Sequence, residues 1–141
     1  MTSHEGAVAR LACAWLLWYP DDRMFERLPD IRAALAELPA QTRDPLTAFL
    51  GWLDEQDRMD LAREYVTTFD MRRKACPYLT YWTHGDTRNR GMAILHFKQA
   101  YLDNGFDAGD AEPADHLAVV LEFAAIGDRL TGDALLAEHV G

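Results

Sequence analysis

The side chains of this sequence that could do acid–base or metal chemistry are its histidines and the carboxylates near them. Asp115 and His116 are neighbours, but adjacent residues of a helix point about 100° apart, so they cannot easily form a proton relay with one another. The five histidines include no pair at i, i+4 spacing and no nearby carboxylate at ligand spacing. Catalysis requires a nucleophile or an acid–base pair in a defined pocket. We therefore predict neither catalytic residues nor a metal site.

The carboxylates of the C-terminal third form a different pattern. Asp115, Glu122 and Arg129 recur at intervals of seven along an otherwise apolar segment. Because this interval drifts only about 20° per step, the pattern predicts one narrow polar stripe on a buried helix. The stripe is either the solvent edge of a core helix or a row of side chains facing a gap in the fold, where a ligand binds. The pattern alone leaves both interpretations open.

An alternative function rests on Asp86, Arg88 and Arg90, which could serve a small helical enzyme that binds a nucleotide or a phosphate. However, residues 85–88 lack the glycine spacing and the lysine of a nucleotide cradle. Asp86 or Thr87 is more simply the N-cap of a helix that ends at Asn104-Gly105. We therefore keep a nucleotide- or phosphate-binding enzyme as the alternative function, and we predict that this chain is not an enzyme.

The charge of the chain is acidic and unevenly distributed. The net charge is −9, from 23 acidic and 14 basic residues. Residues 1–71 include 7 basic and 13 acidic side chains, and residues 72–98 include 6 basic and 1 acidic side chain. Residues 99–141 include 1 basic and 9 acidic side chains. Such a field repels nucleic acids. It favours a basic partner segment near the C-terminal third, although an acidic face kept for solubility explains the charge equally well.

Every long periodic segment predicts a helix, and no alternating strand pattern appears. The first helix lies between Ser3 and Pro20, Pro29 and Pro45 stand where first-turn prolines belong, and a fourth helix begins near Asp57. Residues 70–85 are expected to be irregular, and further helices are expected over 86–104, from about 115 to 130, and over about 132–139. At 141 residues this is one domain. We predict an all-α fold, a compact bundle of about six to seven helices over residues 1–141.

The cysteines and the apolar runs indicate a cytoplasmic protein. Cys13 and Cys76 show no metal-ligand spacing and provide no disulfide framework, which is consistent with a reducing compartment. The apolar run 11–19 is too short to span a bilayer and has no cleavage site after it. The basic cluster 72–74 is internal and precedes no apolar stretch, so it is no twin-arginine signal. We predict no direct membrane insertion.

Several motifs carry a resemblance to a known family. Glu112-Pro-Ala-Asp-His-Leu117 followed by Leu121-Glu-Phe-Ala124 resembles the signature of the redox enzyme maturation proteins, the all-helical chaperones of molybdoenzymes. Tyr65-Val-Thr-Thr-Phe-Asp70 and residues 78–93 are similar to the branch of NarJ-like delta-subunit chaperones of respiratory nitrate reductase, and residues 16–21 and 97–105 fit as well. These motifs cover most of the chain in order. The resemblance implies a TorD-like fold.

The resemblance also implies a function. Chaperones of this branch bind the N-terminal segment of the catalytic alpha subunit, hold the apo-enzyme off the membrane and permit insertion of the molybdenum cofactor. The client handles that cofactor, so none is bound permanently here. A groove for such a segment takes an amphipathic helix in apolar contact and holds its basic residues at carboxylates. By position, the family's groove residues are Tyr65, Phe69, Asp70, Tyr78, Tyr81, Asp86, Arg88, Arg90, Asp115, His116 and Glu122.

The C-terminus carries one further expectation. The chain stops at Gly141, where members of that family usually continue with further helices. A domain truncated there would leave Val120, Phe123 and Leu130 partly exposed. Because exposed apolar surface usually recruits a partner, we expect a homodimer or an exchanged helix that covers this face.

Overall fold

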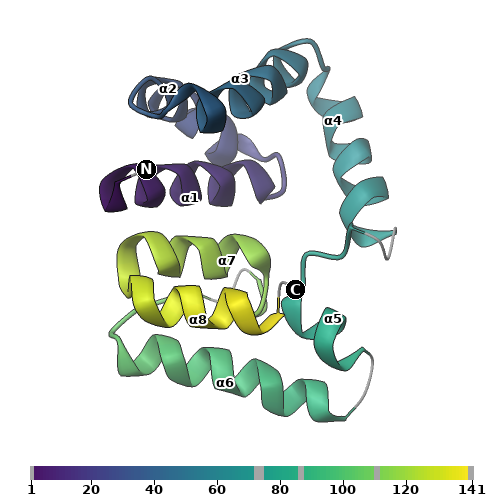
Figure 1. Ribbon diagram of the computed structural model, residues 1–141. Coiled ribbons are helices and arrows are strands. Elements are labelled where there is room, and N and C mark those ends of the chain that lie inside the picture. The colour runs from purple at the N-terminus through teal and green to yellow at the C-terminus, as the bar shows by residue number, and fades with distance from the viewer. Residues whose placement is uncertain (1, 72–74, 86–87, 110–111, 140–141) are drawn as a thin grey trace. The chain divides into compact units, whose positions relative to one another are not determined.

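The computed structural model describes residues 2–71, 75–85, 88–109 and 112–139 (Figure 1). These ranges contain eight α-helices and two π-helical turns, and no strand beyond one isolated bridge between Tyr78 and His116. The predicted all-α class is therefore confirmed, whereas the predicted count of six to seven helices is too low. The unexpected helix is α5 (Leu79–His84), which lies in the stretch expected to be irregular. A TorD-like arrangement stays a prediction.

The chain divides into two compact units, residues 1–75 and 76–141, and each has its own core. The first unit contains α1 (Ser3–Leu17), α2 (Asp22–Leu35), α3 (Ala40–Asp54), α4 (Arg58–Tyr65) and the π-helical turn η1 (Val66–Asp70). Its core is an aliphatic cluster to which all four α-helices contribute: Ala9, Ala12, Met24, Leu28, Ile31, Leu35, Leu38, Leu50, Leu53 and Leu61. None of the helices in the described ranges combines the length and the apolar character needed to cross a bilayer.

The starts of these helices show where local sequence signals succeed and fail. Helix α4 begins directly after Asp57, as predicted, and the Asp57 side chain caps it by accepting a hydrogen bond from the backbone N–H of Met59. The prediction that Pro29 and Pro45 open helices is wrong, because they lie inside α2 and α3. Asp21 caps α2 eight residues before Pro29, and the buried side chains on both sides of this proline continue one stripe: Met24, Leu28, Ile31 and Leu35. Core packing thus outweighs the hydrogen bond that a proline cannot make.

The second unit contains α5, α6 (Asn89–Asp103), α7 (Leu117–Glu122), the π-helical turn η3 (Phe123–Gly127) and α8 (Arg129–His139). Asn104 and Gly105 end α6 as predicted, and Gly105 adopts φ +65°. The predicted caps of this helix, Asp86 and Thr87, lie outside the described residues. In Figure 1, α8 lies between α6 and α7, and the centroid of the His139 ring at its end lies 5.0 Å from that of the Phe97 ring in α6.

The core of the second unit corrects the expectation about the C-terminal face. Val120 and Phe123 are fully buried, and only Leu130 is exposed as expected. The ring of Phe123 packs against Tyr101 at 4.8 Å and against Phe106 at 5.2 Å between centroids. This unit therefore closes its own aromatic core, and the predicted homodimer cannot be based on exposure of Val120 and Phe123.

Candidate functional site

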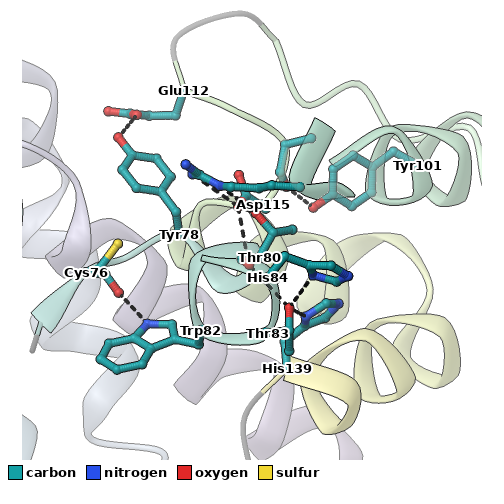
Figure 2. A network of polar contacts seen from close by, with 12 residues as sticks. Cys76, Tyr78, Thr80, Trp82, Thr83, His84, Tyr101, Glu112, Asp115 and His139 are labelled. Carbon is teal, nitrogen blue, oxygen red and sulfur yellow. Dashed lines mark hydrogen bonds and ion pairs between the residues drawn. The ribbon is translucent and has the colours of Figure 1, made fainter. Parts of the chain in front are cut away.

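Asp115 lies in the turn before α7 and is fully buried, with 0% of its surface exposed. Its Oδ2 accepts hydrogen bonds from the backbone N–H of Thr80 (3.2 Å) and from the Thr80 hydroxyl (2.6 Å), as Figure 2 shows. Arg90 of α6 donates from Nε to the same hydroxyl oxygen (2.9 Å), and its Nη2 lies 3.9 Å from Asp115 Oδ2. One carboxylate therefore ties the start of α5 and the first turn of α6 to the entrance of α7.

Backbone contacts reinforce this junction. The N–H of Leu79 donates to the carbonyl of Asp115 (3.0 Å), and the N–H of Leu117 donates to the carbonyl of Pro77 (2.7 Å). His116 caps α7, because its Nδ1 accepts from the backbone N–H of Ala118 (3.0 Å). Burial lowers the pKa of His116 to about 4 despite the nearby Asp115 carboxylate, so the imidazole is neutral at pH 7. A neutral ring can accept at Nδ1, which is the state that the cap requires.

Two tyrosines complete the network. Tyr78 donates from its hydroxyl to Glu112 (3.2 Å), and the guanidinium of Arg90 lies 5.8 Å from its ring centroid. Tyr101 donates to the carbonyl of Ala114 (2.5 Å). Burial and the negative charge of Asp115 raise the pKa of Tyr101. The motif from Glu112 to His116 is therefore a junction at the centre of the second unit, and its aspartate does not face solvent.

The predicted polar stripe is wrong. Asp115 precedes α7, Glu122 is the last residue of α7, and Arg129 is the first residue of α8. The His116 cap starts α7 only at Leu117, and the π-helical turn η3 then changes the helical periodicity. The backbone of Asp128 is extended and ends the helical run before α8. Glu122 is half-buried, and burial raises the pKa of its carboxyl group.

The other predicted site residues are placed as follows. Tyr65, Phe69 and Asp70 belong to the first unit, whereas all the others belong to the second. Asp70 and Arg88 are exposed, and Asp86 lies outside the described residues. Tyr81 is half-buried with its ring 6.0 Å from that of Trp82. The structure brings together Tyr78, Arg90, Asp115 and His116, and it brings together Tyr65 and Phe69. One groove lined by both sets stays a prediction.

The first unit contains an apolar pocket of about 450 Å³ beside Tyr65 and Phe69. The hydroxyl of Tyr65 donates to the carbonyl of Leu17 (3.0 Å), and its ring lies 4.8 Å from that of Phe69. The lining residues come from α1, α2, α3, α4, η1 and the turn before α2: Cys13, Leu16, Leu17, Trp18, Pro20, Met24, Leu46, Phe49, Trp52, Leu53, Leu61, Glu64, Tyr65, Thr68 and Phe69. This volume lies within the range of roughly 300–1,000 Å³ that is typical of ligand sites.

Glu64 is the one carboxylate among these lining residues. It is exposed, and its carboxylate accepts a hydrogen bond from the Thr68 hydroxyl (3.3 Å) one turn further along. Phe49 and Trp52 of α3 lie at the pocket with partly exposed rings 5.7 Å apart. Sequence reasoning missed these two aromatic residues as site residues, because Phe49 reads as part of the core-facing stripe of its helix. Their i, i+3 spacing was the available signal.

Comparison with known proteins identifies the family. Residues 35–139 match the family described as nitrate reductase delta subunit, and the chain belongs to that family. It is 41% identical over 124 residues to the nitrate reductase-like protein NarX of Mycobacterium tuberculosis H37Rv, and the aligned residues cover 88% of this chain and 19% of NarX. It is 35% identical over 128 residues to the probable nitrate reductase molybdenum cofactor assembly chaperone NarJ of Bacillus subtilis 168. These aligned residues cover 90% of this chain and 68% of that NarJ protein.

A third relative supports the same family. The nitrate reductase molybdenum cofactor assembly chaperone NarJ of Escherichia coli K12 is 31% identical over 113 residues, or 78% of this chain and 48% of that protein. The chain thus spans about a fifth of NarX and about half of the E. coli chaperone. The resemblance to NarJ-like chaperones is confirmed. Because the two NarJ relatives are named as assembly chaperones and not as catalysts, they support the prediction that the chain is not an enzyme.

The contacts of Arg90 give the enzymatic alternative no further support. Its guanidinium is engaged with Thr80 and lies over Tyr78. Among the described residues, no group of three or more His, Cys, Asp or Glu side chains is placed to hold a metal ion.

Proposed function

We propose that this protein is a cytoplasmic, system-specific chaperone that binds the N-terminal segment of the apo nitrate reductase alpha subunit. In this role it assists insertion of the molybdenum cofactor and assembly before membrane attachment, and the client enzyme holds the cofactor. The observation that carries the proposal is the apolar pocket of the first unit, which Tyr65 and Phe69 help to line. Family membership supports the choice of client.

The chemistry of the pocket defines the segment that it would take. Aromatic and aliphatic walls suit the apolar face of an amphipathic helix, with large side chains at i and i+3 or i+4 entering the pocket. Glu64 stands beside these walls as an exposed carboxylate, so a basic residue next to the apolar face would pair with it. The occupant is therefore an amphipathic segment that is both apolar and basic.

The second unit contributes in another way. Asp115 is fully buried and its Oδ2 is bonded to Thr80, and His116 caps α7. We propose that these two residues support binding by keeping α5, α6 and α7 in place, without touching the segment. The exposed residues Asp70 and Arg88 and the half-buried Tyr81 remain candidates for direct contact.

A protection experiment tests both the function and the location. Cys13 lines the pocket, whereas Cys76 belongs to the second unit. In a Cys76→Ser variant, the alpha-subunit N-terminal peptide should slow modification of Cys13 by N-ethylmaleimide in proportion to the bound fraction, and a scrambled peptide should not. Burial raises the pKa of the Cys13 thiol, so the unprotected reaction is itself slow and needs long sampling times.

The reciprocal control uses Cys13→Ser, in which Cys76 should react at the same rate with and without peptide. Absence of peptide binding in calorimetry would refute the proposed function. Binding without protection of Cys13 would keep the function and place the site elsewhere. If the peptide occupies the pocket, Phe49→Ala should weaken binding by about tenfold, as loss of an aromatic contact does, whereas Met59→Ala, exposed on α4 and outside the pocket lining, should not.

A further inference from the structure

The outward side of α6 carries a row of large apolar side chains. Met92, Leu95 and Leu102 are 70%, 53% and 72% exposed, whereas Phe97 and Tyr101 of the same helix are buried in the core of their unit. Exposed apolar residues scattered singly over a surface are normal, but a row of them along one helix marks a surface that binds a partner. Helix α6 is therefore apolar on two sides, and its own unit buries one of them.

The spacing of this row indicates what kind of partner it fits. Positions 92, 95, 99 and 102 follow one another by three, four and three residues, which is the a–d–a–d spacing of a coiled coil. Such a stripe packs against the same kind of stripe on a second helix. Gln99 occupies the second a position, where a single polar residue specifies the register of the pair. The partner surface is thus another helix with a matching polar position.

The charged residues beside the stripe fit a second copy of α6. Lys98 stands at a g position and Asp103 at the following e position. In a parallel pair each g residue faces the next e residue of the other helix, so Lys98 of each copy would face Asp103 of the other. An antiparallel pair with the same residues in contact would bring the two Lys98 ammonium groups together, which is unfavourable. Asp103 accepts from the Gln99 amide through Oδ1 (2.8 Å), and its other oxygen can accept from lysine.

We propose that two copies of this chain associate through their α6 helices in parallel, with Met92, Leu95, Gln99 and Leu102 in the seam. The two Gln99 amides face each other, and two Lys98–Asp103 pairs flank them. The seam lies in the second unit and the apolar pocket in the first, so this association does not depend on the proposed peptide binding.

The length of the seam sets the expected strength. Its residues span only about two heptads, whereas an independent coiled coil needs about three to four. However, α6 is already held in its helical form by Phe97 and Tyr101, so association need not fold it. A weak dimer that dissociates on dilution is therefore expected.

Sedimentation velocity over a dilution series measures this association. Leu95→Glu should raise the dimer dissociation constant by at least about tenfold, because it places a charge in the seam. Met59→Glu adds the same charge at an exposed position of α4 and should leave the constant unchanged. Circular dichroism should show the same helical content in both variants. A protein that stays monomeric at every concentration, or a dimer that Leu95→Glu does not weaken, would overturn the proposal.

Charge reversal and cross-linking test the parallel arrangement. Lys98→Asp should weaken the dimer by about tenfold, since two attractive pairs become repulsive, and adding Asp103→Lys should restore most of the affinity. In a background of Cys13→Ser and Cys76→Ser, Leu95→Cys should form an intermolecular disulfide on mild oxidation. If cross-linking instead requires Leu95→Cys in one copy and Gln99→Cys in the other, the helices are antiparallel and the parallel arrangement is wrong.

Discussion

At the scale of single residues, Asp115 shows how a motif that suggests a binding site can serve the interior. Its Oδ2 accepts both hydrogen bonds from Thr80, and its Oδ1 is buried without a hydrogen-bond partner among the described residues. A buried carboxylate is retained only when its contacts offset the loss of hydration. Here those contacts join three helices, so we expect its removal to affect folding first.

Asp115→Ala should lower the free energy of unfolding by about 2–3 kcal/mol, because the buried hydroxyl and N–H of Thr80 lose a charged acceptor. Asp115→Asn keeps an oxygen in the same place and should cost less. Urea denaturation of the two variants measures the difference. If Asp115→Ala abolished peptide binding while leaving the unfolding midpoint unchanged, Asp115 would be a contact residue and not part of an internal junction.

His116 makes stability depend on pH. Its pKa is about 4 in the folded protein and about 6.5 when unfolded. Above pH 6.5 the His116 imidazole is neutral in both the folded and the unfolded protein, and its full contribution to the free energy of unfolding is present. As the pH falls from 6.5 to 4, only the unfolded protein takes up a proton at this residue. The free energy of unfolding therefore falls by up to about 3 kcal/mol.

His116→Asn should keep a cap for α7 and remove this titration, so its stability should change less between pH 6.5 and 4 than that of the wild type. Some slope should remain, because burial also lowers the pKa of His139. Chemical denaturation at a series of pH values provides the comparison. Equal slopes in both proteins would mean that His116 is not the group responsible.

At the scale of elements, the close approach of α8 to η3 depends on a glycine. A β-carbon at position 132 would lie 2.5 Å from Ala124 Cβ and 2.6 Å from Ala124 Cα. Because the second of these atoms belongs to the backbone, a side-chain rotation cannot relieve the contact. Gly132 is therefore what allows α8 to pack against the buried end of η3.

Gly132→Ala should destabilise the protein by about 1–3 kcal/mol, since overpacking outweighs the gain in helix propensity. Gly51→Ala is the matched control, because Gly51 lies within α3 and a β-carbon there meets nothing within 4 Å. That variant should gain about 0.5–1 kcal/mol. Thermal melts of the two variants should therefore shift in opposite directions, and a stabilised Gly132→Ala protein would contradict the close packing.

At the scale of the whole molecule, charge acts on any basic partner in two ways. The chain as a whole carries −9, and Glu64 adds a local carboxylate at the apolar pocket. The general field mainly accelerates encounter and is screened by salt over about 10 Å at 0.1 M. A local pair also fixes which residue of the peptide lies beside the pocket.

Glu64→Gln should weaken binding of the alpha-subunit peptide and flatten its dependence on salt. Glu26→Gln, an exposed residue of α2 outside the pocket lining, changes the net charge equally and should have a smaller effect. Calorimetry at two or three salt concentrations separates the local pair from the general field. If the two variants showed the same peptide affinity and the same dependence on salt, only the general field, and not a local pair at Glu64, would act on the peptide.

Much of the helical organisation could be predicted from the sequence because helix signals are local. The Asp57 cap and the Asn104-Gly105 stop act within one turn, and the all-α class follows from several such segments. The motifs at 65–70 and 112–124 also predicted the family correctly. Local signals failed where tertiary packing determines the secondary structure. Helix α2 continues through Pro29, and α5 forms in a segment whose sequence shows little helical periodicity.

The amino-acid sequence by itself therefore determined the helical class, several helix boundaries, the acidic charge and the family. Only the tertiary structure decided which polar residues are buried. In the sequence, Asp115 has the pattern of an exposed carboxylate, but in the structure it accepts a hydrogen bond from Thr80, which lies 35 positions earlier in the chain. The pocket likewise joins Cys13 of α1, Phe49 of α3 and Phe69 of η1. Such sites depend on contacts between distant segments, which helical periodicity does not encode.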